Sequence, residues 1–249
     1  MSLTSDFRPH TIQPVLKPAL PPPVPSRRFN RPKMSTEVAA YLRDLIMSGQ
    51  LAPGSPLRLA DLAAQLSVST TPIREAVLIL EKEGFVECER HKAFRVKLIT
   101  AADIVDLFEL HAAIAGILAE RATPLLTEGE LDGLAEIDRC IQRAVASGDA
   151  KEVEEQNFDF HRTINRAAES TTLRRFLHET TRYVPRRFYQ QIPGWLNSSA
   201  QDHGPILYAL RRRDGSEARR RTEEHMKGAG TLLVEHLRSL GLWKNYRAE

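Results

Sequence analysis

Residues 48–86 read SGQLAPGSPLRLADLAAQLSVSTTPIREAVLILEKEGFV, and this stretch decides the fold of the N-terminal part of the chain. Apolar residues recur at three- and four-residue steps over 59–66 and again over 73–80, a spacing that is typical of amphipathic helices. Between these runs, SVSTTP combines helix-capping side chains with a proline in the first helical turn. The stretch therefore predicts two short helices that are joined by a sharp polar turn.

A helix is predicted before this stretch and a β-hairpin after it. Residues 38–46 repeat apolar side chains at helical steps, and Ser35 is a suitable N-cap. Residues 85–89 and 93–98 alternate between apolar and polar side chains on either side of a short connection, as the strands of a hairpin do. The predicted order is helix, helix, turn, helix and hairpin. This order indicates a winged helix-turn-helix.

From Ala101 onward the apolar pattern is almost entirely helical. Helices are expected at about 101–122, 127–147, 149–168, 171–190, 198–213 and 215–240. The short loops between them favour a compact bundle. We therefore expect a mainly α fold, with an N-terminal winged helix-turn-helix and a C-terminal all-helical bundle.

The composition of the 249 residues excludes several classes of protein. Hydrophobic residues make up 42% of the chain and charged residues 27%, which fits a globular protein with a substantial core. The cysteines, Cys88 and Cys140, are too few for a disulfide framework or a thiolate zinc cluster. No run approaches the roughly 18 apolar residues that a membrane-spanning helix needs. We expect a cytoplasmic protein without a membrane partner.

The third predicted helix is the candidate for reading DNA, because the N-terminal end of such a helix enters the major groove. Hydroxyl groups at that end can bind phosphate, and the guanidinium of Arg74 can reach the O6 and N7 atoms of guanine. An ion pair of Arg74 with Glu75 or Glu81 is the alternative. The residues predicted to contact DNA are Arg58, Ser69, Thr70, Thr71, Arg74, His91 and Lys92.

The stretch from Gly49 to Val86 also resembles the DNA-binding domain of GntR-type bacterial transcription regulators, and the resemblance covers about 34–97. It implies a homodimeric regulator that binds a short inverted repeat in double-stranded DNA, with repression as the favoured response, and it implies no enzyme activity. Thr70 stands where the family commonly has arginine, and Lys92 stands where it commonly has a glycine of the wing. These departures leave the operator sequence and the geometry of the wing open.

Histidines in the second half of the chain form a candidate metal site. Asn157 and His161 are four residues apart and share one face of a helix, and His203 and His225 follow on later helices. Imidazole and amide ligands suit a divalent ion of the Zn²⁺, Ni²⁺ or Mn²⁺ type. By spacing alone, such histidines also fit surface positions or hydrogen-bonded positions in a core.

The segments LFELHAAIAGILAERA, NFDFHRTINRAAESTTLRRF, DHGPILYALRRRD and EEHM resemble the helical effector domain of the FadR branch of GntR regulators, over about 101–240. Members with a metal use an Asp-x-x-x-His pair and two later histidines, which implies Asn157, His161, His203 and His225 as ligands here. Asn157 replaces the usual aspartate. The resemblance also implies an organic acid as effector, and the residues that we assign to it are His111, Arg182 and Arg186.

Two alternatives follow from the same residues. A metal-free pocket for an acyl or other apolar ligand is the first, since Asn157 is a weak ligand and His111 stands where the family commonly has arginine. A catalytic metal centre is the second, and it lacks a general base, because Glu224 should point away from the metal. Neither the effector nor the target genes can be named from the sequence.

The chain is expected to divide into four parts. The first 33 residues hold eight of the 15 prolines and six basic residues against one acid, which is unfavourable for folding and suits either a polyanion or a solvated tail. The expected parts are a proline-rich basic arm without fixed structure at 1–33, a winged helix-turn-helix DNA-binding domain at 34–99, a helical effector-binding and dimerisation domain at 100–242, and a tail at 243–249.

Overall fold

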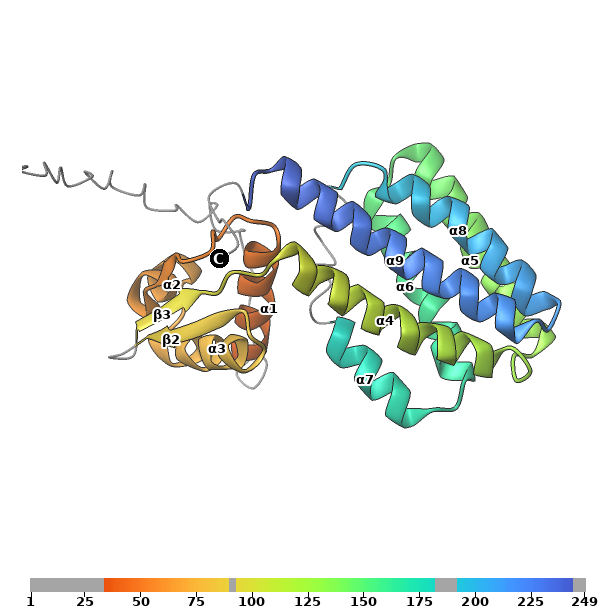
Figure 1. Ribbon diagram of the computed structural model, residues 1–249, viewed down its shortest axis with the longest axis horizontal. Coiled ribbons are helices and arrows are strands. Elements are labelled where there is room, and N and C mark those ends of the chain that lie inside the picture. Colours follow the sequence, from red (N-terminus) through yellow and green to blue (C-terminus); the bar gives the residue numbers. More distant parts are fainter. Residues whose placement is uncertain (1–33, 90–92, 182–191, 244–249) are drawn as a thin grey trace, which may run out of the picture.

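The computed structural model describes residues 34–89, 93–181 and 192–243 of the chain, and these residues form two lobes (Figure 1). The N-terminal lobe contains three helices and a three-stranded antiparallel sheet of order β1-β3-β2. Its elements are α1 (Met34–Met47), β1 (Pro56–Leu57), α2 (Leu59–Leu66), α3 (Thr70–Lys82), β2 (Val86–Glu89) and β3 (Ala93–Val96). This arrangement is a winged helix-turn-helix.

The core of this lobe is built by the apolar positions that define the predicted helices. Ile73, Val77 and Leu80 on one face of α3 are completely buried, and they pack with Leu42 of α1. Between α2 and α3 the chain turns at Ser67, which has a positive φ of 54°. The turn ends at the N-cap residue Ser69, so that α3 leaves α2 in a new direction, and Thr70 and Thr71 at its N-terminal end are exposed.

One strand of the sheet is missing from the sequence-based prediction. Pro56 and Leu57 pair with Arg95 and Phe94 of β3, although the proline-rich segment around them is typical of a turn. A proline is tolerated here because β1 lies at the edge of the sheet, where one side of the strand needs no backbone donor.

The C-terminal lobe consists of helices in the part of the chain that the structure describes, and the predicted mainly α fold is confirmed. They are α4 (Ala101–Ala122), α5 (Glu128–Ser147), α6 (Ala150–Ala167), α7 (Thr171–Thr181), α8 (Trp195–Arg211) and α9 (Gly215–Ser239). Helix α8 begins at Trp195, earlier than the predicted residue 198, and the predicted continuation of α7 to 190 lies outside the described residues. None of these described helices is apolar over a length sufficient to cross a lipid bilayer.

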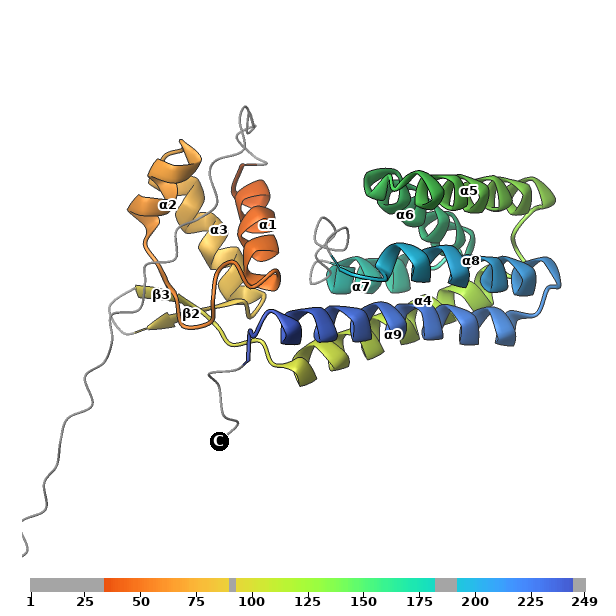
Figure 2. The same ribbon diagram turned by 90° about the horizontal axis from the view of Figure 1, so that it is seen from above.

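Helices α4 and α9 lie side by side along the lobe, and glycine allows their close approach (Figures 1 and 2). A Cβ atom on Gly230 of α9 would lie 2.6 Å from the ring of Phe108, and one on Gly116 of α4 would lie 2.6 Å from the side chain of Glu223. A larger residue would therefore force the ring of Phe108 or the side chain of Glu223 to move. The close approach brings His111 of α4 and His225 of α9 to the same region of the lobe.

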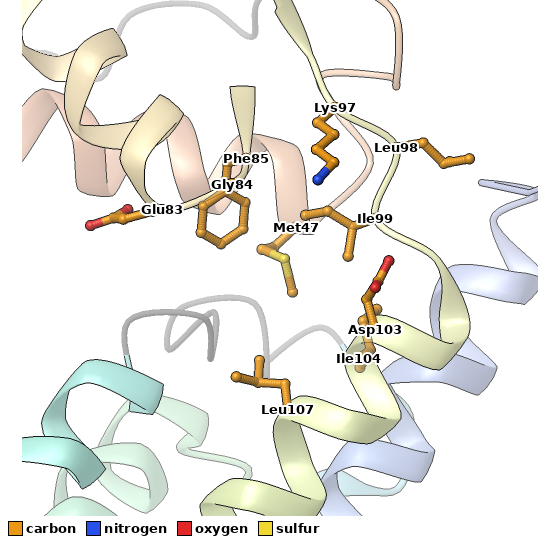
Figure 3. A pocket seen from close by; sticks show the side chains of 10 residues that line it. All are labelled: Met47, Glu83, Gly84, Phe85, Lys97, Leu98, Ile99, Asp103, Ile104 and Leu107. Atoms are coloured by element: carbon orange, nitrogen blue, oxygen red, sulfur yellow. The ribbon is translucent and has the colours of Figure 1, made fainter. Parts of the chain in front are cut away.

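The two lobes share apolar contacts. Met47 and Phe85 of the N-terminal lobe face Ile104 and Leu107 of α4 across a cavity of about 240 Å³ (Figure 3). A hydrogen bond adds to these contacts. The indole Nε1 of Trp243, which follows α9, donates a hydrogen bond of 2.8 Å to the carbonyl oxygen of Ile99 in the linker. The end of the chain's last helix is therefore tied to the segment that joins the lobes.

Candidate functional site

The predicted DNA-contacting residues that the structure describes are exposed. Ser69 is the N-cap of α3, and its side chain makes no cap hydrogen bond, so its hydroxyl group is available to a ligand. Thr70, Thr71 and Arg74 are exposed on the first turns of α3, and Arg58 is exposed just before α2. Within the described residues, no carboxylate forms an ion pair with Arg74, so the proposed pair with Glu75 or Glu81 is not formed. His91 and Lys92 lie outside the described residues.

The three predicted histidine ligands come together from three helices. Nε2 of His161 on α6 lies 3.1 Å from Nε2 of His225 on α9 and 3.3 Å from Nε2 of His203 on α8. The candidate ligand atoms of all three lie within 4.8 Å of one another. Imidazole nitrogens bind Zn²⁺ at about 2.0–2.1 Å, so two such ligands at right-angled to tetrahedral positions are about 2.8–3.4 Å apart. The distances from His161 to His225 and to His203 match that of nitrogens around one ion.

A carboxylate fixes the orientation of His225. Its Nδ1 lies 3.1 Å from Oδ2 of Asp202, and that oxygen also accepts a hydrogen bond of 3.0 Å from the hydroxyl of Ser198. A carboxylate only accepts hydrogen bonds, so Nδ1 carries a hydrogen, and Nε2, which faces the other histidines, is the nitrogen that is placed to bind a metal ion. The hydrogen bond from His225 also lowers the pKa of Asp202, so its charge is retained. A carboxylate behind a histidine ligand in this way is common at metal sites.

Burial keeps the other two imidazoles neutral. His203 has no exposed surface, and its ring stacks on Phe160 with the ring centres 4.3 Å apart. Burial, and then the charge of His225, lowers the pKa of His203 and of His161 well below the ordinary 6.5. A neutral imidazole has a lone pair to give to a metal ion.

Asn157 adds an oxygen to the lining of the cavity beside the histidines. Its Oδ1 is buried and has no hydrogen-bond partner, and its side chain lines the same cavity as His161 and His225. A buried oxygen without a partner costs about 1–3 kcal/mol, and a bound cation would remove this cost. The donor set of three imidazoles and one amide oxygen therefore fits a divalent transition-metal ion, and it differs from the usual set by one negative charge.

His111 lies in the cavity as a neutral residue. Its Nδ1 is 2.8 Å from the hydroxyl oxygen of Thr180, and that hydroxyl donates its own hydrogen to the carbonyl of Leu177 at 2.8 Å. His111 must therefore donate from Nδ1, and its Nε2 is an acceptor. Burial, followed by the charge of His225, lowers the pKa of His111 to about 4. This residue can accept a hydrogen bond from a ligand, but it does not replace the positive charge of an arginine.

The histidine cluster opens on a cavity of about 660 Å³ between α6, α7, α4 and α9. The sequence predicted that Arg182 and Arg186 supply the positive charge for the effector, and both residues lie outside the described part of the chain. Arg174, which lines the cavity, was not predicted. The signal was available, because Arg174, Leu177, His178 and Thr181 have the spacing of one helical face, and all of them line the cavity.

Removing the carboxylate of Asp202 tests its role at this site. We expect Asp202→Ala to weaken Zn²⁺ binding by about 10–100-fold, because His225 would lose the acceptor that holds its ring and its tautomer. The measurement is competition of the protein with a chelating dye. Ser198→Ala is the control, since it removes a hydroxyl that donates to the same oxygen but leaves the carboxylate in place. Unchanged affinity in Asp202→Ala would show that the carboxylate does not act on the metal site.

Two family models match the chain, and they match the two lobes separately. The model of the bacterial regulatory proteins of the gntR family matches residues 34–96, and the model of the FCD domain matches residues 106–228. The chain belongs to the GntR family and carries an FCD domain. The predicted family is confirmed at this level.

Relatives of this GntR protein are regulators of transcription. It is 29% identical to the probable D-xylose utilization operon transcriptional repressor of Paenarthrobacter nicotinovorans, over 81% of this chain and 89% of that protein. It is 30% identical to the gluconate operon transcriptional repressor of Bacillus subtilis, over 57% of this chain and 58% of the relative. The expectation that the protein is a regulator and not an enzyme is confirmed by these relationships.

Solved structures of the family have the same fold. Escherichia coli McbR/YncC superposes with a TM-score of 0.59 at 22% identity, over 86% of this chain and 99% of that structure. Lar, which controls the expression of the Listeria monocytogenes agr system, gives a TM-score of 0.56 at 17% identity, over 84% of this chain and 99% of that one. At such identities the likeness establishes the architecture of the GntR protein and nothing about its ligands.

Proposed function

We propose that this GntR protein is a repressor of the FadR branch that binds DNA as a homodimer. Its affinity for DNA changes when a small carboxylate binds next to a divalent metal ion. The observation that carries the proposal is the cluster of three imidazole nitrogens within 4.8 Å of one another, beside a cavity that His161, His225 and the unpartnered amide oxygen of Asn157 line. Its place of action is the cytoplasm, where bacterial chromosomal DNA lies.

The residues at this site would have different roles in binding the metal ion and the effector. His161, His203, His225 and Asn157 would hold the ion, which when bound supplies positive charge and open coordination positions for a carboxylate oxygen. His111 would accept a hydrogen bond at its Nε2 from a hydroxyl group of the effector. A relative that represses a gluconate operon supports an effector of this class, because gluconate is a hydroxylated carboxylate.

The structure offers a physical route from the cavity to the DNA-binding lobe. Helix α9 carries His225, and the residues that follow it contact the linker through Trp243 and approach Gly49 of the N-terminal lobe through Leu242. A shift of α9 on effector binding would therefore change the position of the winged helix-turn-helix. Such coupling needs an effector that binds one arrangement of the lobes more tightly than the other.

The DNA contacts are proposed for the exposed end of α3, with Ser69, Thr70 and Thr71 on phosphates and Arg74 on a base. Arg58 adds a phosphate contact from the start of α2. Two such helices in a homodimer would read the two halves of an inverted repeat.

Gel-shift titration on the DNA that flanks the gene tests the proposal. We expect tight, salt-dependent binding to an inverted repeat over random duplex, and a change in that affinity when Zn²⁺, Ni²⁺ or Mn²⁺ and a small carboxylate are present together. A response to a fatty acid without any metal would favour the alternative of a metal-free pocket. Equal affinity for every duplex would contradict the proposed function.

A further inference from the structure

Arg174 has an unusual environment for an arginine. It lies in the first turns of α7, it is half-buried, and it lines the cavity of about 660 Å³ beside the histidine cluster. Its Nε is buried and has no hydrogen-bond partner, and within the described parts of the chain no carboxylate pairs with its guanidinium. A buried donor without a partner is costly, and folded proteins retain few of them.

Other arginines of this protein that are withdrawn from solvent have partners. Arg43, with 12% of its side chain exposed, pairs with Glu83. Arg219, which is partly buried, pairs with Glu223 at 2.8 Å and with Glu120 at 3.2 Å. The position of Arg174 is therefore not explained by the packing of the helices alone.

The charged groups around the cavity leave Arg174 available. Arg162 is paired with Asp159 at 3.0 Å, and Glu155 is paired with Lys151 at 3.5 Å. Arg166 also lines the cavity, but it is exposed to solvent. Among the described side chains of the cavity, Arg174 is the half-buried cation whose Nε has no partner.

We propose that Arg174 binds a second anionic group of the effector, so that the cavity selects dicarboxylates over monocarboxylates. This inference rests on the proposed function, in which the first carboxylate lies next to the metal at the histidine cluster. The guanidinium presents a planar fork of N–H donors that matches a carboxylate, and the pair would replace the missing partner of the buried Nε. The cavity volume leaves room for a chain of several carbons between the two groups.

Pairs of acids with equal carbon number test the second subsite directly. The probes are butanoate and succinate, pentanoate and glutarate, and hexanoate and adipate, titrated into zinc-loaded full-length protein by calorimetry. We expect at least one diacid to bind more tightly than its monoacid. Arg174→Gln should weaken that diacid by about 10–100-fold, the usual cost of losing hydrogen bonds to a charged group, and should leave the monoacids unchanged.

Arg175→Gln is the matched control, because it removes the same charge from the next residue. Arg175 is exposed, and its guanidinium lies over the ring of Phe176 at 5.3 Å and not in the cavity. This variant should keep the preference for the diacid. The melting temperature of the metal-free protein gives a second readout, and Arg174→Gln should equal or exceed the wild type, because it removes a buried donor that has no partner.

The outcomes separate the subsite from the proposed function. Monoacids and diacids that bind equally well to the wild type, or a diacid preference that survives in Arg174→Gln, would overturn the Arg174 subsite and leave the metal-dependent carboxylate site standing. A lowered melting temperature with an unchanged diacid preference would assign Arg174 to the fold alone. Failure of every acid to bind the zinc-loaded protein would overturn both.

Discussion

A His203→Gln variant should bind Zn²⁺ or Ni²⁺ more than about 100-fold more weakly than the wild type, since even partners behind the ligands change metal affinity by about 10–100-fold. Nε2 of His203 lies 3.3 Å from that of His161, so the variant takes away one of the three nitrogens that surround the candidate ion. Glutamine retains most of the volume beside Phe160 and avoids the cavity that alanine would leave in a fully buried position.

Two measurements check this result. Metal content is determined on protein purified without chelators, and affinity is determined by competition with a dye. His178→Gln is the control, because His178 lines the same cavity but lies outside the cluster, on the exposed side of α7. The metal site would be refuted if the wild type contained no metal and took up none, or if the His203 variant retained a full equivalent.

An Arg74→Ala variant should lose about 1–3 kcal/mol of binding free energy on the cognate operator, which is the value of a good bidentate contact to a base. Arg74 is exposed near the N-terminal end of α3, and no carboxylate among the described residues forms an ion pair with it. Its guanidinium is therefore available to DNA. Its loss on random duplex should be much smaller, because sequence-independent binding depends on phosphate contacts.

Fluorescence anisotropy with operator and random duplexes measures both losses. Lys82→Ala is the control, because it removes a positive charge from the same helix at its other end, away from the proposed groove contact. It should affect both duplexes weakly and alike. If Arg74→Ala weakened the operator and the random duplex equally, Arg74 would be a phosphate contact, and sequence reading would have to lie elsewhere.

Much of the N-terminal lobe could be predicted because its helices are defined by neighbouring residues. The apolar repeat of Ile73, Val77 and Leu80 predicts α3, and the core shows all three completely buried. The edge strand at Pro56 and Leu57 could not be predicted in the same way, because its partner, Phe94, is remote in the sequence. Proline near glycine carries a local turn signal, and a pairing across the sheet overrides it.

The candidate metal site was predicted by residue type, helical spacing and resemblance. Its chemistry was not, because burial and hydrogen bonding decide it. Asp202 was not assigned a role, although it is adjacent to His203, because its contact is with His225 on another helix. His111 was left open between a polar contact and a neutral core residue, and the structure shows a buried side chain that is neutral and also lines the cavity.

Local patterns in the sequence determined that this chain is a mainly α protein with a winged helix-turn-helix, because the periodicity of helices and strands depends on neighbours within a few residues along the chain. The histidines that are candidates for one ion were assigned by residue type, helical spacing and resemblance together. The tertiary structure decided that Arg174 lies half-buried in the cavity beside the histidines, with an unpartnered Nε, and that Asp202 orients His225. These are consequences of how α6, α7, α8 and α9 pack, and the free energy of a charge or a hydrogen bond depends on such surroundings and not on the order of residues.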